Sequence, residues 1–169
     1  METTAAELEA LLARRGVPFE RFDHDPVFTC DDVARIVPAE AGGVQTKNLF
    51  VRDKKGQRHW LVVTDCSRAV DLKALAPMIG ADHLSLGSPE RLMRCLGVSP
   101  GSVTLLGLVN DPDHQVGLVI DRDVWDAPTL RCHPLTNTAT LVIPHDGIAR
   151  FLEATGHQPL VTVLPLRPS

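Results

Sequence analysis

The sequence predicts one domain of the α+β class, with a mixed and mostly antiparallel sheet surrounded by helices. Its 169 residues, 44% of them hydrophobic and 22% charged, are typical of one compact domain with one core. Helical and strand-like patterns alternate irregularly, and several strand-like runs lie close enough in sequence to form hairpins. We therefore expect residues 1–169 to fold around one sheet, without a linker or an internal repeat.

The N-terminal part is predicted to contain two helices separated by a short strand. Thr4 and Glu7 have the spacing of a capping box, which favours a helix start at this point. Asp31 and Asp32 supply the acidic first turn of the second helix. The expected elements are a helix that ends before Gly16, a strand at 17–22, a helix at 31–37 and a glycine-bearing loop at 39–44.

Strand-like runs dominate the rest of the chain. Residues 48–52 and 59–64 flank a segment, Asp53-Lys54-Lys55-Gly56-Gln57, whose composition is typical of a hairpin turn. The later expected elements are helices at 71–79, 88–97 and 146–156, strands at 103–109, 117–120, 130–133 and 138–143, and a final apolar run at 160–164.

Charge and composition exclude several classes of partner. Seventeen basic and 21 acidic side chains give a formal net charge of −4, which argues against a protein that wraps duplex DNA. Aromatic residues make up 4% of the chain, too few for a platform that stacks successive single-stranded bases. A small contact with one end of a nucleic acid is compatible with this charge and composition. No apolar run reaches the roughly 18 residues of a membrane span, so we expect a cytoplasmic protein.

The four cysteines, Cys30, Cys66, Cys95 and Cys132, lie far apart in the sequence. None belongs to a C-x-x-C pair, which a redox dithiol, an iron–sulfur cluster or a zinc knuckle would use. We therefore expect four buried free thiols with a structural role. The histidines also lack metal-ligand spacing, so the sequence predicts neither a metal nor a cofactor. The motifs of P-loop NTPases, dinucleotide enzymes, α/β-hydrolases and zincins are absent as well.

Three short polar segments between apolar runs are the candidates for chemistry. The first is Gln45-Thr46-Lys47-Asn48, where a loop enters an apolar run. An ammonium at the end of a sheet can bind a phosphate, a hydroxyl or a carbonyl group. The alternative is an ordinary surface lysine, with Asn48 bonded to loop backbone.

The second segment is Gly97-Val98-Ser99-Pro100-Gly101-Ser102, directly after a predicted helix. Glycines let backbone N–H groups approach a ligand closely, and successive amides can hold an anion or a developing oxyanion. A glycine that ends the helix, followed by a Ser-Pro turn, would give the same pattern.

The third segment begins at His133 and continues through small polar residues to Thr140. An imidazole beside hydroxyls and the Asn137 amide suits the polar edge of a small substrate, and a histidine that bonds only backbone is the alternative. A basic patch, which includes Arg52, Lys54 and Lys55, lies at the presumed hairpin turn. Such a patch is either a solvated turn or a contact for phosphates that lead toward Lys47.

In their residues and their order, the three segments resemble the YbaK-like family, which includes the editing domain of bacterial prolyl-tRNA synthetases. The resemblance spans nearly the whole chain and is strongest to free-standing prolyl-tRNA synthetase-associated proteins, which deacylate alanine wrongly attached to tRNA(Pro). It implies a single α+β domain without a metal. Lys47 matches the functional lysine of the family, and His133 matches the pocket histidine of alanine-specific members. The chain reads G-x-x-P at 97–100, where the family usually has G-x-x-x-P.

The resemblance implies a trans-editing hydrolase that cleaves the ester of alanyl-tRNA(Pro), with the tRNA(Pro) acceptor end and prolyl-tRNA synthetase as candidate partners. Such editing has a physical reason, because a synthetase built for proline rejects the smaller alanine by only about 1–3 kcal/mol. The expected catalytic residues are Lys47, Gly97, Ser99 and His133, the expected substrate-binding residues are Thr46, Asn48, Val98, Pro100, Gly101 and Asn137, and the expected tRNA contacts are Arg52, Lys54 and Lys55. The alternatives are a deacylase for cysteine or serine esters and a non-catalytic module that binds tRNA or a synthetase.

Overall fold

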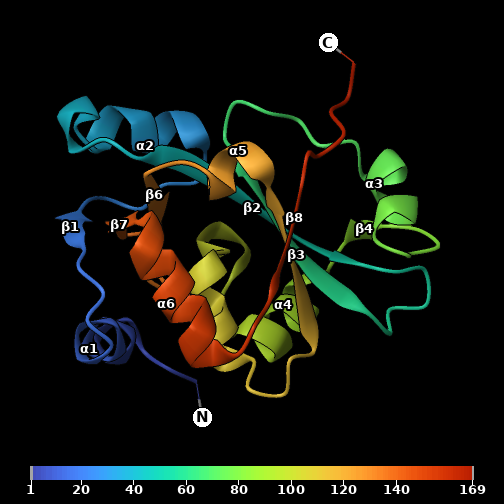
Figure 1. Cartoon of the computed structure of the whole chain (residues 1–169), viewed down its shortest axis with the longest axis horizontal. Coiled ribbons are helices and arrows are strands. Elements are labelled where there is room, and N and C mark those ends of the chain that lie inside the picture. The colour runs from blue at the N-terminus through green and yellow to red at the C-terminus, as the bar shows by residue number, and fades with distance from the viewer. Residues whose placement is uncertain (1, 169) are drawn as a thin grey trace.

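The computed structural model describes residues 2–168, apart from the side chains of Val33 and Ala34, so the two ends of the expected domain, Met1 and Ser169, lie outside the described residues. Its centre is an eight-stranded sheet in the order β1-β7-β6-β2-β3-β5-β8, with β4 paired to β2 off this path (Figure 1). Among the strand pairings of the described chain, four are antiparallel and three are parallel. The mixed sheet predicted from the sequence is therefore confirmed.

The observed elements mostly fall where the sequence places them. The strands are β1 (Glu20–Asp23), β2 (Val44–Arg52), β3 (His59–Asp65), β4 (Ser85–Leu86), β5 (Val116–Asp121), β6 (Thr129–Cys132), β7 (Ala139–Pro144) and β8 (Pro159–Thr162). The helices are α1 (Ala5–Arg14), α2 (Cys30–Ile36), α3 (Leu72–Met78), α4 (Pro89–Leu96), α5 (Arg122–Trp125) and α6 (His145–Thr155). Within the described residues there are also three 3₁₀ segments, η1 (Ala39–Ala41), η2 (Pro100–Ser102) and η3 (Leu105–Asn110).

The β2–β3 hairpin sets the position of the first polar segment. Lys47 lies opposite Thr64, and Arg52 lies opposite His59 next to the turn. Asp53 holds the turn, since its Oδ1 accepts hydrogen bonds from the backbone N–H groups of Gln57 at 2.8 Å and of Arg58 at 3.2 Å. A strand rises about 3.3 Å per residue. Lys47 and the turn therefore lie at opposite ends of the hairpin.

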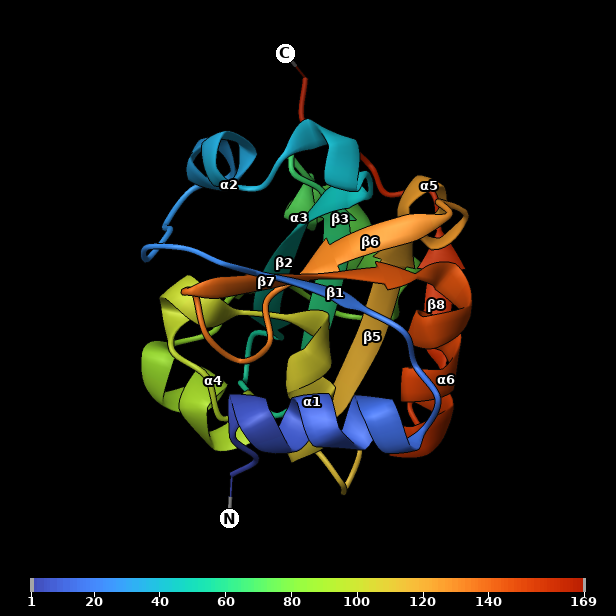
Figure 2. The same cartoon turned by 90° about the vertical axis from the view of Figure 1, so that its left-hand side faces the viewer.

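Two apolar cores lie on the two faces of the central strands. Leu61 and Val63 of β3 pack in the larger core with α1, α4, α6 and η3, which Figure 2 shows gathered in the lower half of the molecule. Trp60 and Val62 of the same strand pack on the opposite face with α3. Alternate side chains of a strand point to opposite faces, and β3 is apolar on both. This explains why its sequence reads as a continuous apolar run.

The strand predicted at residues 103–109 is wrong, because Leu105–Asn110 forms the 3₁₀ helix η3. The hydroxyl of Thr104 accepts a hydrogen bond from the backbone N–H of Leu106 at 3.2 Å, which starts the helical turn. Gly107 allows close packing on α4, since a Cβ at this position would lie 3.3 Å from the Cβ of Leu96. A short buried apolar run has the same sequence pattern in a strand and in a buried helix.

The expectation of four free thiols is also wrong, because Cys30 and Cys66 form a disulfide. It joins the first residue of α2 to the segment directly after β3, across a sequence separation of 36 residues. Cys95 and Cys132 are free thiols, and burial raises the pKa of Cys132 to about 12. Pairing of the first two cysteines depends on how α2 lies against the sheet, which no local pattern in the sequence shows.

Candidate active site

A cavity of about 240 Å³ lies between the start of α2, the first half of β2, the η2 turn and the loop after β6. It brings together the three polar segments, which are far apart in the chain. Six of the predicted site residues line it, namely Thr46, Lys47, Asn48, Pro100, Gly101 and His133. The cavity is therefore the candidate active site.

The first half of the glycine-bearing loop lies outside this lining. Gly97 ends α4 with a φ of 66°, and a Cβ there would lie 2.7 Å from Nδ2 of Asn110. Val98 is buried in the larger core, and Ser99 is exposed before η2. Gly97 instead borders a separate open hollow of about 980 Å³ beside α4. Gly97, Val98 and Ser99 therefore set the position at which the loop begins. Pro100 and Gly101, which follow them, line the cavity.

Asn137 holds the cavity wall without lining it. Its side-chain Nδ2 donates to the backbone carbonyl oxygen of Val27 at 3.1 Å. Its backbone carbonyl oxygen accepts a hydrogen bond from the backbone N–H of Val27 at 3.2 Å. A Cβ on Gly101 would lie 3.3 Å from the same Nδ2 and 3.6 Å from the Phe28 ring. Asn137 therefore ties the segment before α2 to the β6–β7 loop, and glycine at 101 leaves room between them.

Lys47 lies on β2 at the cavity, with its ammonium turned toward the loop after β3. Nζ donates a hydrogen bond to the carbonyl oxygen of Arg68. Burial lowers the pKa of Lys47, the charge of Arg167 lowers it further, and Asp65 opposes the shift. One N–H of the ammonium is thus fixed by backbone, and its two other protons are available to a ligand.

His133 lines the cavity directly after β6, the strand that pairs in parallel with the start of β2. Its backbone carbonyl accepts a hydrogen bond from the buried hydroxyl of Thr104 at 2.7 Å, which fixes the residue against η3. Its ring Nδ1 lies 3.2 Å from the carbonyl oxygen of Ala139. Burial lowers the pKa of His133, an effect that the bond to Ala139 partly opposes and the charge of His24 reinforces. Burial at this position therefore favours the neutral form of the ring.

Two residues that line this cavity each carry a buried side-chain oxygen with no hydrogen-bond partner among the described residues. The oxygens are Oε1 of Gln45 and Oδ1 of Asn48, both in the first half of β2. A buried acceptor without a partner costs about 1–3 kcal/mol, so such groups are rare outside functional sites. The pair is suited to a ligand that brings donors, such as an ammonium or a hydroxyl group.

Sequence reasoning missed several lining residues. Gln45 belongs to the first polar segment, and its position two residues from Lys47 is the signal that could identify it. Val27, Phe28 and Val103 form apolar walls, and nothing in their local pattern distinguishes them from core residues. The disulfide also borders the cavity through Cys30 and Cys66.

The basic patch at the hairpin does not line the cavity. The guanidinium of Arg52 donates to the carbonyl oxygens of Asp53 at 3.0 Å and Lys54 at 3.2 Å, so it folds back on the turn. Lys54 and Lys55 are exposed. Arg52 lies five residues from Lys47 on β2, a span of about 17 Å along an extended strand. Any contact of this patch with a ligand occurs well away from the cavity.

Within residues 2–168, no group of three or more His, Cys, Asp or Glu side chains is arranged to hold a metal ion. None of the described helices has both the length and the apolar character needed to cross a lipid bilayer.

The fold is thus an α+β domain with one small cavity lined by a lysine, a histidine and two residues that carry unpaired acceptors. Residues 24–151 match the family described as the aminoacyl-tRNA editing domain. The chain belongs to this family, which confirms the class that the three polar segments predicted.

Relatives of this chain carry related descriptions. It is 34% identical to the prolyl-tRNA editing protein ProX of Acetoanaerobium sticklandii over 88% of this chain and 90% of that protein. It is 37% identical to the prolyl-tRNA synthetase associated domain-containing protein 1 of Danio rerio, over 92% of this chain and 84% of that protein. A crystal structure of a protein with a proposed role as a trans-editing enzyme for prolyl-tRNA synthetase has the same fold. Its TM-score is 0.67 at 20% identity, and the match covers 100% of this chain and 99% of that one.

Proposed function

We propose that this editing domain hydrolyses the ester of alanyl-tRNA(Pro), acting in trans on tRNA that prolyl-tRNA synthetase has mischarged. The observation that carries the proposal is the 240 Å³ cavity in which Lys47, Gly101 and His133 meet beside the unpaired oxygen of Asn48. Its volume suits an aminoacyl group with a small side chain. The descriptions of the relatives support tRNA as the substrate.

The proposed reaction adds water to the ester carbonyl carbon, and the ribose oxygen leaves with a proton. Lys47 binds the carbonyl or the terminal nucleotide with its free ammonium protons, and the backbone around Gly101 polarises the ester. The unprotonated Nε2 of His133 and Oδ1 of Asn48 accept hydrogen bonds from the α-ammonium of the amino acid. The products are alanine and tRNA with a free terminal hydroxyl.

No protein nucleophile takes part in this proposal. Ser99 is exposed outside the cavity, and the two cysteines at its border are joined in a disulfide. The 2′-hydroxyl of the terminal adenosine stands next to the ester and can assist in activating the water. Gly97, Ser99 and Val98 then act by holding the loop, and Thr46 by holding β2 against β6 through its hydrogen bond to the Arg131 carbonyl at 2.6 Å.

The proposed partner is the acceptor end of tRNA(Pro), with prolyl-tRNA synthetase as the source of the mischarged product. Arg52, Lys54 and Lys55 remain proposed contacts for more distant phosphates of the acceptor stem. A net charge of −4 is compatible with this contact, because only one end of the RNA is bound. We propose the cytoplasm as the compartment, because aminoacyl-tRNA is made and used there.

The test is a deacylation assay with tRNA(Pro) charged with alanine, cysteine, serine or proline. We expect alanine to be released and the prolyl ester to persist. If the alanyl ester survives and the cysteinyl or seryl ester is cleared, the amino-acid assignment is wrong. Lys47→Ala is expected to lower the rate about 100-fold with an unchanged melting curve, and Lys47→Arg to keep part of the activity. A wild-type protein that releases no amino acid and still binds tRNA would be the non-catalytic module.

A further inference from the structure

We propose that a second hollow, on the other side of Lys47, holds a phosphodiester group next to the 3′-terminal nucleotide of the RNA substrate. This inference rests on the proposed function. The hollow has a volume of about 400 Å³ and lies between β2, the start of α3, β4 and the C-terminal segment. Lys47 lines both this hollow and the candidate active site. The two sites are therefore neighbours that share one lysine.

The linings of the two sites overlap along β2: residues 45–48 line the candidate active site, and Lys47 and Leu49 line the second hollow. Asn48 lines the candidate active site, whereas Leu49 lines the second hollow. Residues two apart on a strand share a face, so Lys47 and Leu49 lie on the side of α3. Lys47 is the fourth residue of β2, in the half of the strand that begins at Val44, and it is half-buried. A chain that passes this end of β2 contacts both sites.

Three cations meet at the second hollow, namely Lys47, Lys73 and Arg167. Within the described part of the chain, none of them lies within ion-pair distance of a carboxylate. The one acidic lining residue, Asp71, uses Oδ1 to accept the backbone N–H of Ala74 at 3.0 Å and so caps α3. The positive charges exceed the negative ones at this place, and an anion would be attracted.

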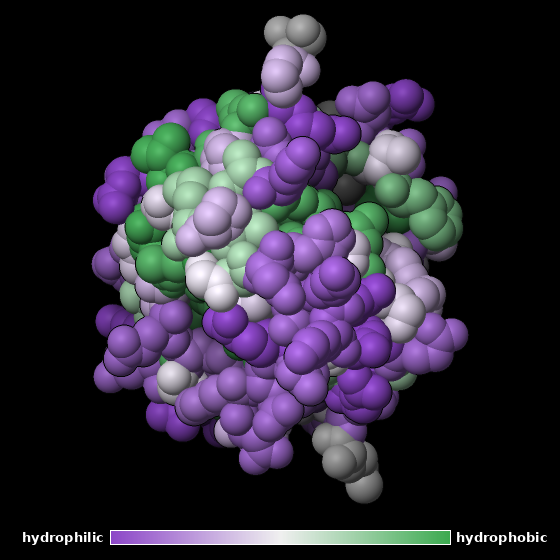
Figure 3. Space-filling model, turned by 90° about the vertical axis from the view of Figure 1, so that its right-hand side faces the viewer, coloured by the Kyte–Doolittle hydropathy of each residue, from purple (hydrophilic) through white to green (hydrophobic). Residues whose placement is uncertain are grey.

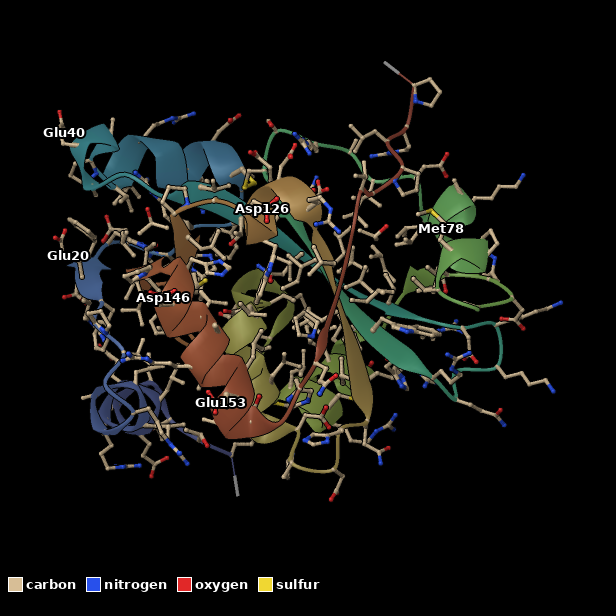
Figure 4. All side chains as sticks on the ribbon, viewed as in Figure 1. Glu20, Glu40, Met78, Asp126, Asp146 and Glu153 are labelled. Carbon is tan, nitrogen blue, oxygen red and sulfur yellow. A yellow bond between two sulfur atoms is a disulfide. The ribbon has the colours of Figure 1, made fainter. Side chains whose placement is uncertain are left out.

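The neighbouring charged groups do not cancel this field. Asp65 is close enough to raise the pKa of Lys47, and its Oδ1 accepts the N–H and the hydroxyl of Ser67 at 2.8 and 2.9 Å. Arg68 is neutralised by Asp121 at 2.8 Å and Asp123 at 2.6 Å. In Figure 4 the labelled acidic residues Glu20, Glu40, Asp146 and Glu153 lie on the other half of the molecule from α3.

The backbone that carries Arg167 is held in place. Its N–H donates to the carbonyl oxygen of Ala69 at 2.8 Å, and the Asp71 N–H donates to the Pro165 carbonyl at 2.8 Å. Val70 and Leu166 form an isolated β-bridge between these bonds. The C-terminal segment thus runs beside the start of α3, and Arg167 is positioned at the hollow before a ligand arrives.

The rest of the lining is apolar and favours a nucleotide over a bare phosphate. Leu49, Val70, Leu72 and Leu86 form it, and Leu86 is 62% exposed. Figure 3 faces this side of the molecule, where green apolar side chains gather in the upper half and purple hydrophilic ones cover most of the lower half. A ribose or a base can cover the leucines as its phosphate meets the cations. Because Lys47 joins the two sites, the bound nucleotide belongs to the same RNA strand as the ester.

The test uses the charge-reversal variant Lys73→Glu/Arg167→Glu, which leaves Lys47 in place. The matched control is Arg14→Glu/Arg15→Glu, the same charge change at the end of α1, across the molecule from α3 in Figure 1. Deacylation is measured with alanyl-tRNA(Pro) and with 3′-O-alanyl-adenosine, which carries the ester and no phosphate. Binding of uncharged tRNA(Pro) is measured by fluorescence anisotropy at several salt concentrations.

We expect the Lys73/Arg167 variant to raise KM for alanyl-tRNA(Pro) about tenfold with little change in kcat, and the control to change neither. The salt slope of tRNA binding should fall by about 0.7 for each lost contact, and hydrolysis of alanyl-adenosine should stay at the wild-type rate. An unchanged KM, an equal effect in the control, or an equal loss with alanyl-adenosine would overturn the proposal. Competition by free AMP that depends on both residues, with tRNA binding unaffected, would also overturn it, because the occupant would then be a free nucleotide. If the wild type hydrolyses neither ester and its tRNA binding still depends on the two residues, the proposed function fails and the RNA site stands.

Discussion

His133 donates its Nδ1 proton to the backbone carbonyl oxygen of Ala139, 3.2 Å away across the loop between β6 and β7. A carbonyl oxygen can only accept, so this bond selects one tautomer of the neutral ring and leaves Nε2 as an acceptor. Burial favours the same neutral form by lowering the pKa of His133. A substrate that brings an ammonium group finds an acceptor in a fixed orientation.

This tautomer predicts the pH dependence of the reaction. We expect kcat/KM to be constant at neutral pH and to fall at acidic pH, with an apparent pKa below the ordinary value of 6.5, because protonated Nε2 can no longer accept. Folding is expected to respond in the same direction, since stability is lost as pH falls from the unfolded pKa through the lowered folded pKa. His133→Ala should lower the rate about 100-fold and remove the acidic limb. A pH–rate profile of both proteins checks this, and an identical limb in the variant would assign it to another group.

The unpaired oxygen of Asn48 predicts that replacing this residue weakens substrate binding without destabilising the fold. Asn48→Ala removes a buried acceptor without a partner, so the free energy of unfolding should stay equal or rise by about 1 kcal/mol. KM for alanyl-tRNA(Pro) should rise by about tenfold or more, because a hydrogen bond to a charged donor is lost. Urea denaturation and steady-state deacylation measure the two effects.

Thr46→Val is the matched control for this prediction. The Thr46 hydroxyl has a partner, the carbonyl oxygen of Arg131 at 2.6 Å, and valine removes this buried hydrogen bond. We expect a loss of about 1–3 kcal/mol in the free energy of unfolding. A loss of stability in Asn48→Ala as large as in Thr46→Val would show that Asn48 supports the fold rather than the substrate.

The sequence predicted the parts of the fold whose causes are local. Thr4 and Glu7 form the expected capping box, with hydrogen bonds of 3.2 and 2.8 Å between each side chain and the backbone of the other. Asp53 holds the expected hairpin turn. The run around Leu106 was assigned to a strand because its apolar pattern fits either a strand or a buried helix, and tertiary packing decides between them.

The sequence predicts the candidate active site to about the same extent as it predicts the fold. Lys47 and His133 stood out because polar residues interrupted apolar strands, and the cavity does bring them together. Which half of the glycine-bearing loop faces the cavity depends on the way α4 ends at Gly97, and the sequence does not show this. Val27 reaches the cavity only because Asn137 holds its backbone, a contact between residues 110 positions apart.

The disulfide predicts a strong dependence of stability on redox conditions. Cys30→Ser/Cys66→Ser releases a loop with a sequence separation of 36 residues, which should lower the free energy of unfolding by about 3 kcal/mol. The melting temperature should fall by about 6–12 °C. A dithiol reductant should produce the same shift in the wild type and none in the double variant. A wild-type melting curve that ignores the reductant would contradict a stabilising cross-link.

The apolar walls of the cavity predict how alanine is separated from proline. Val103 lines the cavity and is half-buried, so Val103→Ala removes two methyl groups from the wall that limits the amino-acid side chain. One methylene of fit is worth about 1–3 kcal/mol, and we expect hydrolysis of prolyl-tRNA(Pro) to rise at least about tenfold. The alanyl ester should lose only a few-fold in rate, since it does not fill that space.

Val98→Ala is the control, because Val98 lies 2% exposed in the core under the same loop and its truncation should lower stability without changing selectivity. The measurement is the rate of hydrolysis of the alanyl and the prolyl ester by each variant. Faster prolyl hydrolysis in Val103→Ala alone would show that Val103 limits the size of the side chain. Faster prolyl hydrolysis in Val98→Ala as well would show that the loop has loosened in general.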